Sequence, residues 1–517
     1  MMWTRHGPLG PPTTLERVAL VAALAVTATL LWPLRHYVTD DTYIHLQYAK
    51  HLAQGRGLVF NAGEHVYGCT SPLWVALLAD AISLHRDGLA AARALGGIAT
   101  LASVAFFWQL LRRNLRSPAL VAAGTLAWAS NAWMLRWALS GMETPLAVAL
   151  TLAGFVAFTE GKQWGARPVR TGALWALAAL ARPEAALLLL LWAMFLLVDA
   201  DNRAGALRLI VGIVPPLAIY GGWLLFAWLY YHALLPQTLA AKAAGSGFAG
   251  RFEAFVRQVE ILGATDGVLL VTLVLALLAT LRRPRAAGRW RAQKLVPWAW
   301  VASVPALYLA RGVPVLSRYL VPLLPVIAWL AWEALERALA PDDPRHSRRL
   351  AWVGALLAAL VVAQNVIVWR TTVLPQVQSF SPALESSLVR WGRWLGAHAR
   401  PGSAIATPDI GAIGYFSDHP VIDLGGLVTP AMVPYLEREE PEQAIARFRF
   451  ASFARPEFVV DRAGEAWDLL RRSPYRACLD TVGTAVVPNL GVARPEPRVY
   501  SIYRVRWDVF DRLHAQK

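Results

Sequence analysis

Charged side chains are scarce in this sequence. Only 16% of the 517 residues are charged, whereas 56% are hydrophobic. Soluble domains carry nearer a quarter charged residues, so the composition excludes an ordinary soluble protein. In place of charge there is a series of apolar runs, and the first, residues 18–34, is uncharged and nearly spans a bilayer core of about 30 Å. The sequence therefore predicts a polytopic membrane protein.

Cysteine and lysine are also scarce. Cys69 and Cys478 are the only cysteines, too few for a disulfide framework or a cysteine-based metal site, and whether they pair stays open. The net charge of +16 comes almost entirely from arginine. The arginines gather in short loops between apolar runs, where they orient the chain and meet anionic lipid. We therefore expect membrane lipid as a partner and no nucleic acid.

The apolar runs predict eleven membrane crossings. The first follows Arg5 and Arg17 as a signal peptide would, but the many later spans favour an uncleaved helix. The predicted spans are 16–34, 88–111, 118–135, 142–159, 170–182, 184–198, 208–230, 263–281, 295–310, 315–335 and 350–369.

A shorter apolar run, residues 71–84, decides the orientation. If it lies along the membrane surface, all the arginine-rich loops face the cytoplasm, as the positive-inside rule requires; if it crosses, all face outward. These loops are 112–116, 161–170, 282–294 and 345–349. We therefore expect residues 71–84 not to cross, with a cytoplasmic N-terminus and with residues 35–87, and everything after Trp369, outside.

Residues 376–517 have a different pattern from the rest of the chain. Short strand-like runs bounded by glycine, proline or aspartate occur at 403–409, 420–426, 457–461 and 498–507, and a two-faced helical run occurs at 387–399. The predicted fold is thus mainly α: a membrane helix bundle over residues 1–375, with its first outer loop at 35–87, and an α/β domain over 376–517 outside the membrane.

Acidic and basic side chains collect in the predicted outer loops. They are Asp40, Asp41, His45, Arg136, Glu143, Arg182, Glu184, Lys242, Arg311 and Arg318. Charges this close to apolar spans usually face a cavity, because exposure to lipid is costly. The pattern indicates an active site at the outer membrane surface.

The adjacent aspartates stand at the start of a predicted helix that runs from Asp40 to about Gln54. Asp41 and His45 share one face of this helix. Asp40 could be an ordinary helix cap. Two neighbouring carboxylates repel each other, however, which raises the pKa of one and suits a general base. They could instead hold a divalent cation through their oxygens.

Arg318 and Lys242 have the opposite charge and invite the opposite role. A guanidinium at a lipid interface can bind phosphate through two hydrogen bonds. The alternative for Arg318 is an arginine that extends to the interface without binding a ligand. For Arg136 and Arg311 this alternative is favoured.

Residues 40–74, DDTYIHLQYAKHLAQGRGLVFNAGEHVYGCTSPLW, resemble the first outer loop of the GT-C glycosyltransferases. These are integral membrane enzymes that use polyprenyl-phosphate sugars, and the nearest resemblance is to terminal arabinofuranosyltransferases of the mycobacterial type. Further matching segments are SGMETPL (140–146), ARPEA (181–185), LLPQTLAAKA (234–243), SRYLVPLLP (317–325) and DIGAIGYFSDHPVIDLGGLVTP (409–430). Gln47, Cys69 and Gln237 depart from the family pattern, and Gln47 puts a phosphate role at that position in doubt.

The resemblance implies transfer of a sugar from a polyprenyl-phosphate donor to an envelope glycan or glycolipid, with inversion. Asp40 is the implied base, Asp41 orients it or binds substrate, and Arg318, more weakly Lys242, holds the donor phosphate. The implied substrate-binding residues are His45, Glu143, Arg182, Glu184 and Thr238. No cofactor is indicated beyond a divalent cation that Asp40 and Asp41 could hold.

Alternatives remain open at this point. A transferase acting on lipid A or on protein would share these motifs, and the sugar, acceptor and linkage are not determined. A secondary transporter usually shows repeats and charges near mid-membrane, which are not visible here. A non-catalytic envelope protein would need no base. For the enzyme we expect a multi-pass protein of the bacterial inner membrane with its active site on the outer, periplasmic face.

Overall fold

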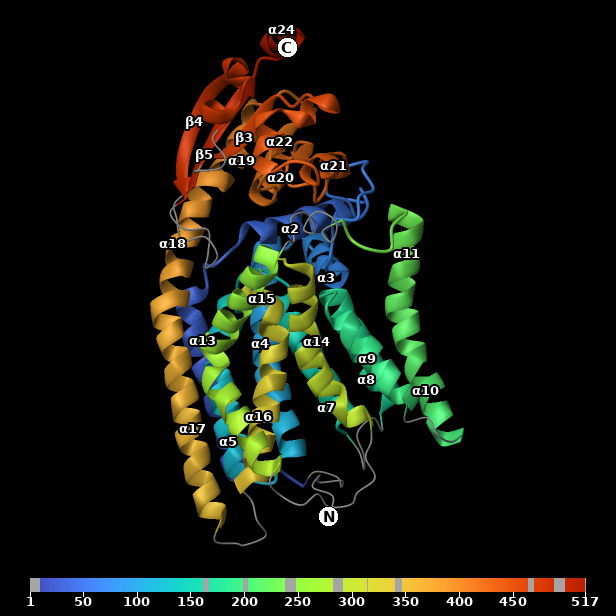
Figure 1. Ribbon diagram of the computed structural model, residues 1–517, viewed down its shortest axis with the longest axis vertical. Helices are drawn as coiled ribbons and strands as arrows, with labels where there is room; N and C mark the ends of the chain where they lie inside the picture. Colours follow the sequence, from blue (N-terminus) through green and yellow to red (C-terminus); the bar gives the residue numbers. More distant parts are fainter. Residues whose placement is uncertain are drawn as a thin grey trace.

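The computed structural model describes residues 10–160, 167–198, 203–237, 248–281, 292–313, 315–339, 346–463, 469–487 and 498–516. A bundle of long helices lies beneath a small α/β domain, and helix α2 (Asp40–Ala53) runs between the two (Figure 1). The described chain begins at the end of the bundle farthest from the α/β domain and ends in that domain. We call the two ends of the bundle the inner end and the outer end, the outer end being the one at α2.

Helices occur at every predicted span. The bundle comprises α1 (Thr14–Leu31), α4 (Gly88–Asn114), α5 (Pro118–Ala129), α6 (Ala132–Ala138), α7 (Thr144–Phe158), α8 (Pro168–Ala181), α9 (Ala185–Val198), α10 (Arg203–Pro216), α11 (Gly222–Tyr231), α13 (Phe248–Leu281), α14 (Val296–Arg311), α15 (Ser317–Leu320), α16 (Leu324–Leu339) and α17 (His346–Val368). Within the described ranges, six helical segments are long and apolar enough to cross a membrane, and four shorter apolar helices accompany them. The chain is a multi-pass membrane protein by these segments, while the number of eleven crossings stays a prediction.

Helix α13 is longer than predicted. It begins at Phe248, whereas the apolar pattern placed its start at residue 263 and left the preceding residues as loop. The first turns carry charges, including the Arg257 Nη1–Glu260 Oε2 pair at 2.7 Å, so the search for apolar residues did not detect them. The helix therefore continues beyond its apolar part.

Residues 71–84 form a short helix, α3 (Pro72–Ser83), that does not carry the chain across the bundle. The chain is at the outer end before and after it. Arg93, near the start of α4, donates hydrogen bonds to the carbonyls of His36 and Tyr37, which precede α2. This agrees with the predicted placement of residues 71–84.

The basic segments that the structure describes lie together at the inner end. Arg112 at the end of α4 lies 3.4 Å from Glu16 at the start of α1. Arg113 and Arg170, from α4 and α8, both pair with Glu160, which follows α7. Their common location is what the positive-inside argument required.

A continuous helical segment, Arg348–His398, joins the bundle to the α/β domain. It passes from α17 through a π-helical turn (Trp369–Val373) into α18 (Leu374–Leu384), and through a second (Glu385–Val389) into α19 (Arg390–His398). The predicted division at residues 375 and 376 lies inside this helix. Pro375 lies in the first turn of α18, directly after the π-helical turn, and does not interrupt the helical segment.

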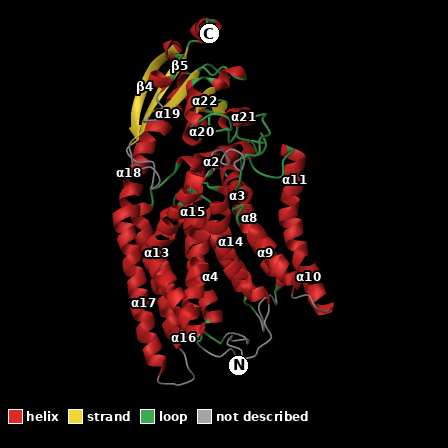
Figure 2. Cartoon of the chain, viewed as in Figure 1, coloured by secondary structure: helices red, strands yellow, loops and turns green. Residues whose placement is uncertain are grey.

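The outer domain contains all the strands in the described residues (Figure 2). Its five-stranded sheet has the order β2-β1-β3-β5-β4, parallel from β2 to β3 and antiparallel thereafter. The strands are β1 (Ile405–Thr407), β2 (Val421–Asp423), β3 (Phe458–Ala463), β4 (Leu479–Val487) and β5 (Arg498–Val505), with helices α20 (Gly411–Ser417), α21 (Val433–Leu436), α22 (Pro441–Ala446), α23 (Leu469–Arg472) and α24 (Trp507–Ala515). Four strands were predicted, and β4 was missed.

Candidate active site

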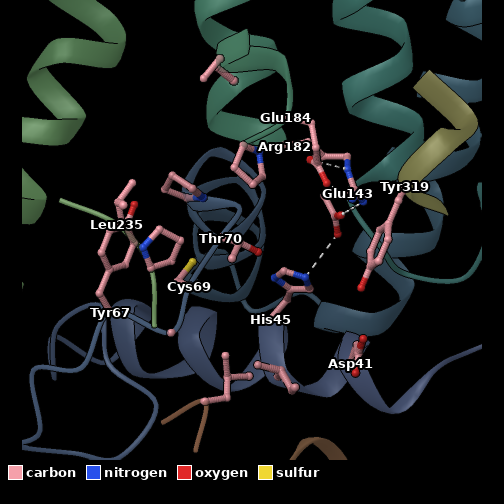
Figure 3. Close-up of a pocket in the computed structure, with 18 of the residues that line it drawn as sticks. Asp41, His45, Tyr67, Cys69, Thr70, Glu143, Arg182, Glu184, Leu235 and Tyr319 are labelled. Carbon is pink, nitrogen blue, oxygen red and sulfur yellow. Dashed lines mark hydrogen bonds and ion pairs between the residues drawn. The ribbon is translucent and has the colours of Figure 1, made fainter. Parts of the chain in front are cut away.

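A cavity of about 620 Å³ lies at the outer end of the bundle, against α2. Residues from the α2–α3 region, the bundle helices and the outer domain all line it. Figure 3 shows a charged side, with Glu143, Arg182, Glu184 and Tyr319, facing an aromatic and apolar side that includes Tyr67 and Leu235. Such a cavity can receive a ligand that has both a charged and an apolar part.

Helix α2 supplies one wall of the cavity. Helix α2 ends as predicted, before Gly55 and Gly57, which both have positive φ. Asp41, Ile44, His45 and Tyr48 line the cavity, at the i, i+3, i+4 and i+7 spacing of one helix face. The N-cap is Thr39 rather than Asp40.

A chain of buried ionic contacts forms the charged side. His45 Nε2 lies 3.3 Å from Glu143 Oε2, and Arg182 Nη1 donates to Glu143 Oε1 at 2.7 Å. The other edge of the Arg182 guanidinium binds Glu184, with Nη2 at 2.9 Å from Oε1, and Tyr308 donates to the same carboxylate. Figure 3 shows the contacts that link His45 to Glu143, Glu143 to Arg182, and Arg182 to Glu184. Arg182 is thus held by two acids, which fixes both carboxylates.

Arg318 and Asp41 bind each other on the wall of the same cavity. Arg318 Nη2 donates to Asp41 Oδ2 at 2.5 Å. The guanidinium also lies over the rings of Trp137 and Tyr319, at 5.6 and 5.4 Å from their centroids. The side chain of Arg318 is only 10% exposed, so it is not an arginine extended into the interface. Arg136 is likewise buried, and it donates to Gln376 instead of extending to the interface.

Asp40 points to the outer domain instead of the cavity. Its carboxylate accepts hydrogen bonds from the backbone of α20, Gly411 N at 3.0 Å and Ala412 N at 2.8 Å. Burial, reinforced by the nearby Asp409 carboxylate, raises the pKa of Asp40 to about 7. The raised pKa was anticipated from the acidic pair, but its causes are burial first and Asp409 second, with Asp41 contributing less. Of the two aspartates, Asp41 is the one that lines the cavity.

The geometry does not favour a cation shared by the two aspartates. Asp40 is engaged by backbone N–H groups and Asp41 by a guanidinium, and each of these occupies carboxylate oxygens that a cation would need. In the part of the chain that the structure describes, no group of three or more His, Cys, Asp or Glu residues is arranged to hold a metal ion.

Thr238 and Lys242 lie outside the described residues. The chain leading to them is described as far as Gln237, whose N–H donates to Tyr67 O at 2.7 Å. Leu234, Leu235 and Pro236 line the cavity. Gln47, where a phosphate role was in doubt, is buried and donates to Phe60 O, away from the cavity lining. Cys69 and Cys478 are free thiols in separate clusters of buried residues.

Several lining residues were not predicted. Tyr308 stacks on Tyr319, with ring centroids 5.4 Å apart, and donates to Glu184. Its position three residues before Arg311, at the outer end of a span, was a usable signal. Gly425 and Leu427 bring a loop of the outer domain to the cavity, and no local pattern in the sequence could reveal that contact.

Comparisons with known proteins agree with this arrangement. The terminal β-(1→2)-arabinofuranosyltransferase of Corynebacterium glutamicum is 28% identical over 285 residues, which are 47% of this chain and 39% of the relative. The protein of the same name from Mycobacterium tuberculosis is 30% identical over 248 residues, 44% of this chain and 39% of the relative. The chain thus matches about two fifths of the length of each curated relative. A family profile described as a domain of unknown function (DUF8728) matches residues 376–503.

Solved structures extend the similarity to nearly the whole chain. ArnT from Cupriavidus metallidurans, bound to undecaprenyl phosphate, aligns with a TM-score of 0.53 at 15% identity, covering 94% of this chain and 97% of ArnT. The protein has the GT-C fold. Mycobacterial arabinofuranosyltransferase AftD aligns with a TM-score of 0.53 at 17% identity, over 96% of this chain and 42% of AftD. The predicted resemblance and the predicted GT-C fold class are therefore confirmed.

Proposed function

We propose that this GT-C protein transfers a sugar from a polyprenyl-phosphate donor to an envelope glycan or glycolipid, on the outer face of the bacterial inner membrane. The observation that carries the proposal is the Arg318–Asp41 pair on the wall of one cavity. It provides a cation for the donor phosphate and a carboxylate for the acceptor hydroxyl next to each other. The apolar side of the cavity suits the first part of a prenyl chain.

The proposed reaction is a direct displacement at the anomeric carbon. Asp41 takes the proton of the acceptor hydroxyl, whose oxygen forms the new bond to the anomeric carbon. The bond from that carbon to the phosphate oxygen breaks, and polyprenyl phosphate leaves with the electron pair. Arg318 stabilises the negative charge that develops on the phosphate. Attack opposite the leaving group inverts the anomeric centre, and Asp41 then releases its proton to water.

The remaining charged residues position and bind the sugar in this proposal. Arg182 is shared by two acids, so its role is to hold Glu143 and Glu184 in place. Glu143 and His45 can then exchange hydrogen bonds with sugar hydroxyls. Thr238 and Lys242 keep their proposed contacts with the donor on the strength of the motif alone. The base is Asp41 here, in place of Asp40, because Asp41 lines the cavity.

The relatives support the donor class and suggest the sugar. Two curated relatives are named as arabinofuranosyltransferases, so a polyprenyl-phosphate arabinofuranose is the first donor to test. The structures of ArnT with undecaprenyl phosphate and of archaeal AglB with dolichol-phosphate support a lipid-phosphate ligand for this fold. The oligosaccharyltransferase of Archaeoglobus fulgidus, another structural neighbour, was solved with a tethered acceptor peptide, so protein is a further acceptor class for the same assay.

The test is transfer by the purified full-length protein in lipid nanodiscs from synthetic polyprenyl-phosphate arabinofuranose to arabinan, glycolipid and peptide acceptors. Asp41→Asn should lower kcat by about 10²–10⁴-fold, since an amide cannot take the proton. Asp80→Asn, the same change at an exposed position of α3, is the matched control and should be fully active. Wild-type turnover by Asp41→Asn would refute the base assignment. Absence of transfer to every acceptor, from this donor and from other polyprenyl-phosphate sugars, would refute the proposed function.

A further inference from the structure

Helix α2 is held from above by the outer domain. The face next to the one that lines the cavity carries Asp40, Tyr43 and Lys50. Asp40 accepts from two consecutive N–H groups of α20, and Lys50 Nζ donates to Tyr415 O at 3.1 Å, on the same helix. The Tyr43 ring meets the Phe416 ring edge-on at 5.0 Å. One face of α2 therefore binds the outer domain along its length, while the next face carries Asp41.

The contact at Asp40 is close enough to require glycine on the other side. A Cβ added to Gly411 would lie 2.0 Å from the backbone oxygen of Asp40 and 2.7 Å from its Oδ2. Real Cβ atoms do not approach so closely, and the nearest of these atoms is backbone. Gly411 has no positive φ, so the requirement comes from the close approach of α20 to α2 and not from the conformation of the glycine itself.

The same contact is electrostatically costly. Asp409, whose carboxylate is held by Arg462 and Tyr500, lies close enough to disfavour a second negative charge at Asp40. No arginine or lysine among the described residues pairs with Asp40. A half-buried carboxylate that lacks a cation and faces another acid is a poor choice for packing alone. Its two hydrogen bonds to α20, by contrast, fix the angular position of α2.

We propose that Asp40 is a positioning residue, through which the outer domain sets the rotation of α2 and thereby aims Asp41 into the cavity. The inference rests on the proposed function of Asp41. Successive residues of an α-helix point about 100° apart, so a single helix can present Asp40 to the outer domain and Asp41 to the substrate. A rotation of about 20° would move a carboxylate roughly 5 Å from the helix axis by roughly 2 Å. Misplacement by ~1 Å can cost about a hundredfold in rate.

Gly411→Ala tests the proposal, because it changes neither aspartate and yet pushes α2 away from α20. The expected result in the transfer assay is a fall in kcat of about tenfold or more, with the donor KM within about twofold, since Arg318 does not lie on α2. Gly263→Ala is the matched control, because a Cβ at Gly263 on α13 meets nothing within 4 Å. It should behave as wild type.

Asp40→Asn supplies the second variant. An amide can accept from one of the two N–H groups but presents its own donors to the other, so kcat should fall by a factor similar to that in Gly411→Ala. Hydrogen exchange measured by mass spectrometry should show faster exchange over residues 40–53 in both variants and unchanged exchange in Gly263→Ala. The unfolding temperature identifies any variant that fails to fold, and exchange of its folded fraction is then the readout.

The outcomes separate the possible roles of Asp40. If Gly411→Ala keeps the wild-type kcat while Asp40→Asn is inactive, Asp40 takes part in the chemistry and the positioning role is wrong. If α2 exchanges at the wild-type rate in both variants, the outer domain does not hold α2 through this contact. If the wild-type protein transfers no sugar, the proposed function fails, but the exchange measurement still decides whether the coupling exists.

Discussion

Two groups of polar residues in the bundle invite comparison. At the outer end, Glu143 and Glu184 share Arg182, and Asp41 binds Arg318. In the interior of the bundle, Asp266 of α13 accepts instead from Thr265 Oγ1 at 2.6 Å and from Asn131 Nδ2 at 3.4 Å. In the described ranges Asp266 has no ion pair. The outer group is ionic, and the inner group consists of one acid among amides and hydroxyls.

The difference follows from the space around each group. The outer group lines the cavity of about 620 Å³, whereas the space beside Asp266 is about 10 Å³, close to the volume that holds one water. Asn365 closes the inner group, with Nδ2 donating to Thr265 O and Oδ1 accepting from Ala132 N. Glu143 and Arg182 of the outer group and Asp266 of the inner group are all buried, so burial alone does not mark an active site. The adjoining cavity does.

The largest expected effect comes from removing the cation of the outer group. Arg182→Ala leaves Glu143 and Glu184 buried without it, which should cost about 3–5 kcal/mol of stability. Thermal unfolding of the protein in detergent measures this loss. Arg170→Ala, which breaks a pair in which the arginine is 60% exposed, is the control and should cost at most about 1 kcal/mol. Equal unfolding temperatures for the two variants would contradict the comparison.

A smaller effect is expected at Arg318, which the proposal assigns to the donor. Arg318→Ala should weaken binding of a polyprenyl-phosphate sugar roughly tenfold or more, because a charged hydrogen bond contributes about 1.5–3 kcal/mol. Arg318→Lys should recover only part of the affinity, since lysine lacks the planar fork. Donor titration by intrinsic fluorescence checks both. Arg35→Ala, at an exposed arginine over Trp32, controls for lost interfacial charge; donor affinity unchanged in Arg318→Ala would remove Arg318 from the site.

A pH effect should distinguish acids that have an arginine from Asp40, which has none. The pKa of Asp40 is raised to about 7 in the folded protein, so the folded state keeps this proton while the unfolded chain loses it near pH 4. Asp40 therefore favours folding most at low pH, and this contribution declines as the pH rises towards 7. Asp40→Asn should flatten the dependence of the unfolding temperature on pH between about 4 and 7. Asp508→Asn, at an exposed acid, should leave the slope unchanged, and so would Asp40→Asn if Asp40 were already ionised at low pH.

The smallest effect is expected at the inner group. Asp266→Asn keeps an oxygen that can accept from Thr265 and Asn131, so transfer activity should stay near the wild-type value. The transfer assay and the unfolding temperature check this together. A loss of kcat as large as that of Asp41→Asn, without loss of folding, would show that the inner group takes part in the reaction and that the comparison is mistaken.

Much of this arrangement could be predicted from the sequence. Apolar runs located the helices, arginine counting placed residues 71–84, and the neighbourhood of charge and span end brought Asp41, His45 and Glu143 to one site. Each of these signals is local: it needs only the preference of charge for water and of apolar length for lipid. The four strands that were predicted are bounded by glycine, proline or aspartate.

Other features depend on contacts that no local pattern records. The sequence could not tell which of Asp40 and Asp41 faces the cavity, because that depends on where α20 docks, some 370 residues later. Strand β4 was missed because residues 481–486 are exposed or half-buried without a regular apolar alternation, because Gly483 weakens the pattern further, and because its partner is β5. The Arg182–Glu184 pair is local, but the pair of Arg182 with Glu143, 39 residues earlier in the chain, is a contact that only the fold reveals.

The helical segment Arg348–His398 has a mechanical consequence. Its 51 residues extend ~77 Å, more than twice the ~30 Å thickness of the hydrocarbon core. The helix therefore continues well beyond the membrane and holds the outer domain away from the lipid headgroups. The contact of α2 with α20 is a second attachment of the outer domain, and it prevents that domain from rotating about the axis of the long helix. Each residue inserted into the long helix would move the outer domain by ~1.5 Å along the helix axis and rotate it by about 100°. The contact between α2 and α20 could not be kept after such a movement. The length of this helix is therefore constrained even where its side chains touch only lipid.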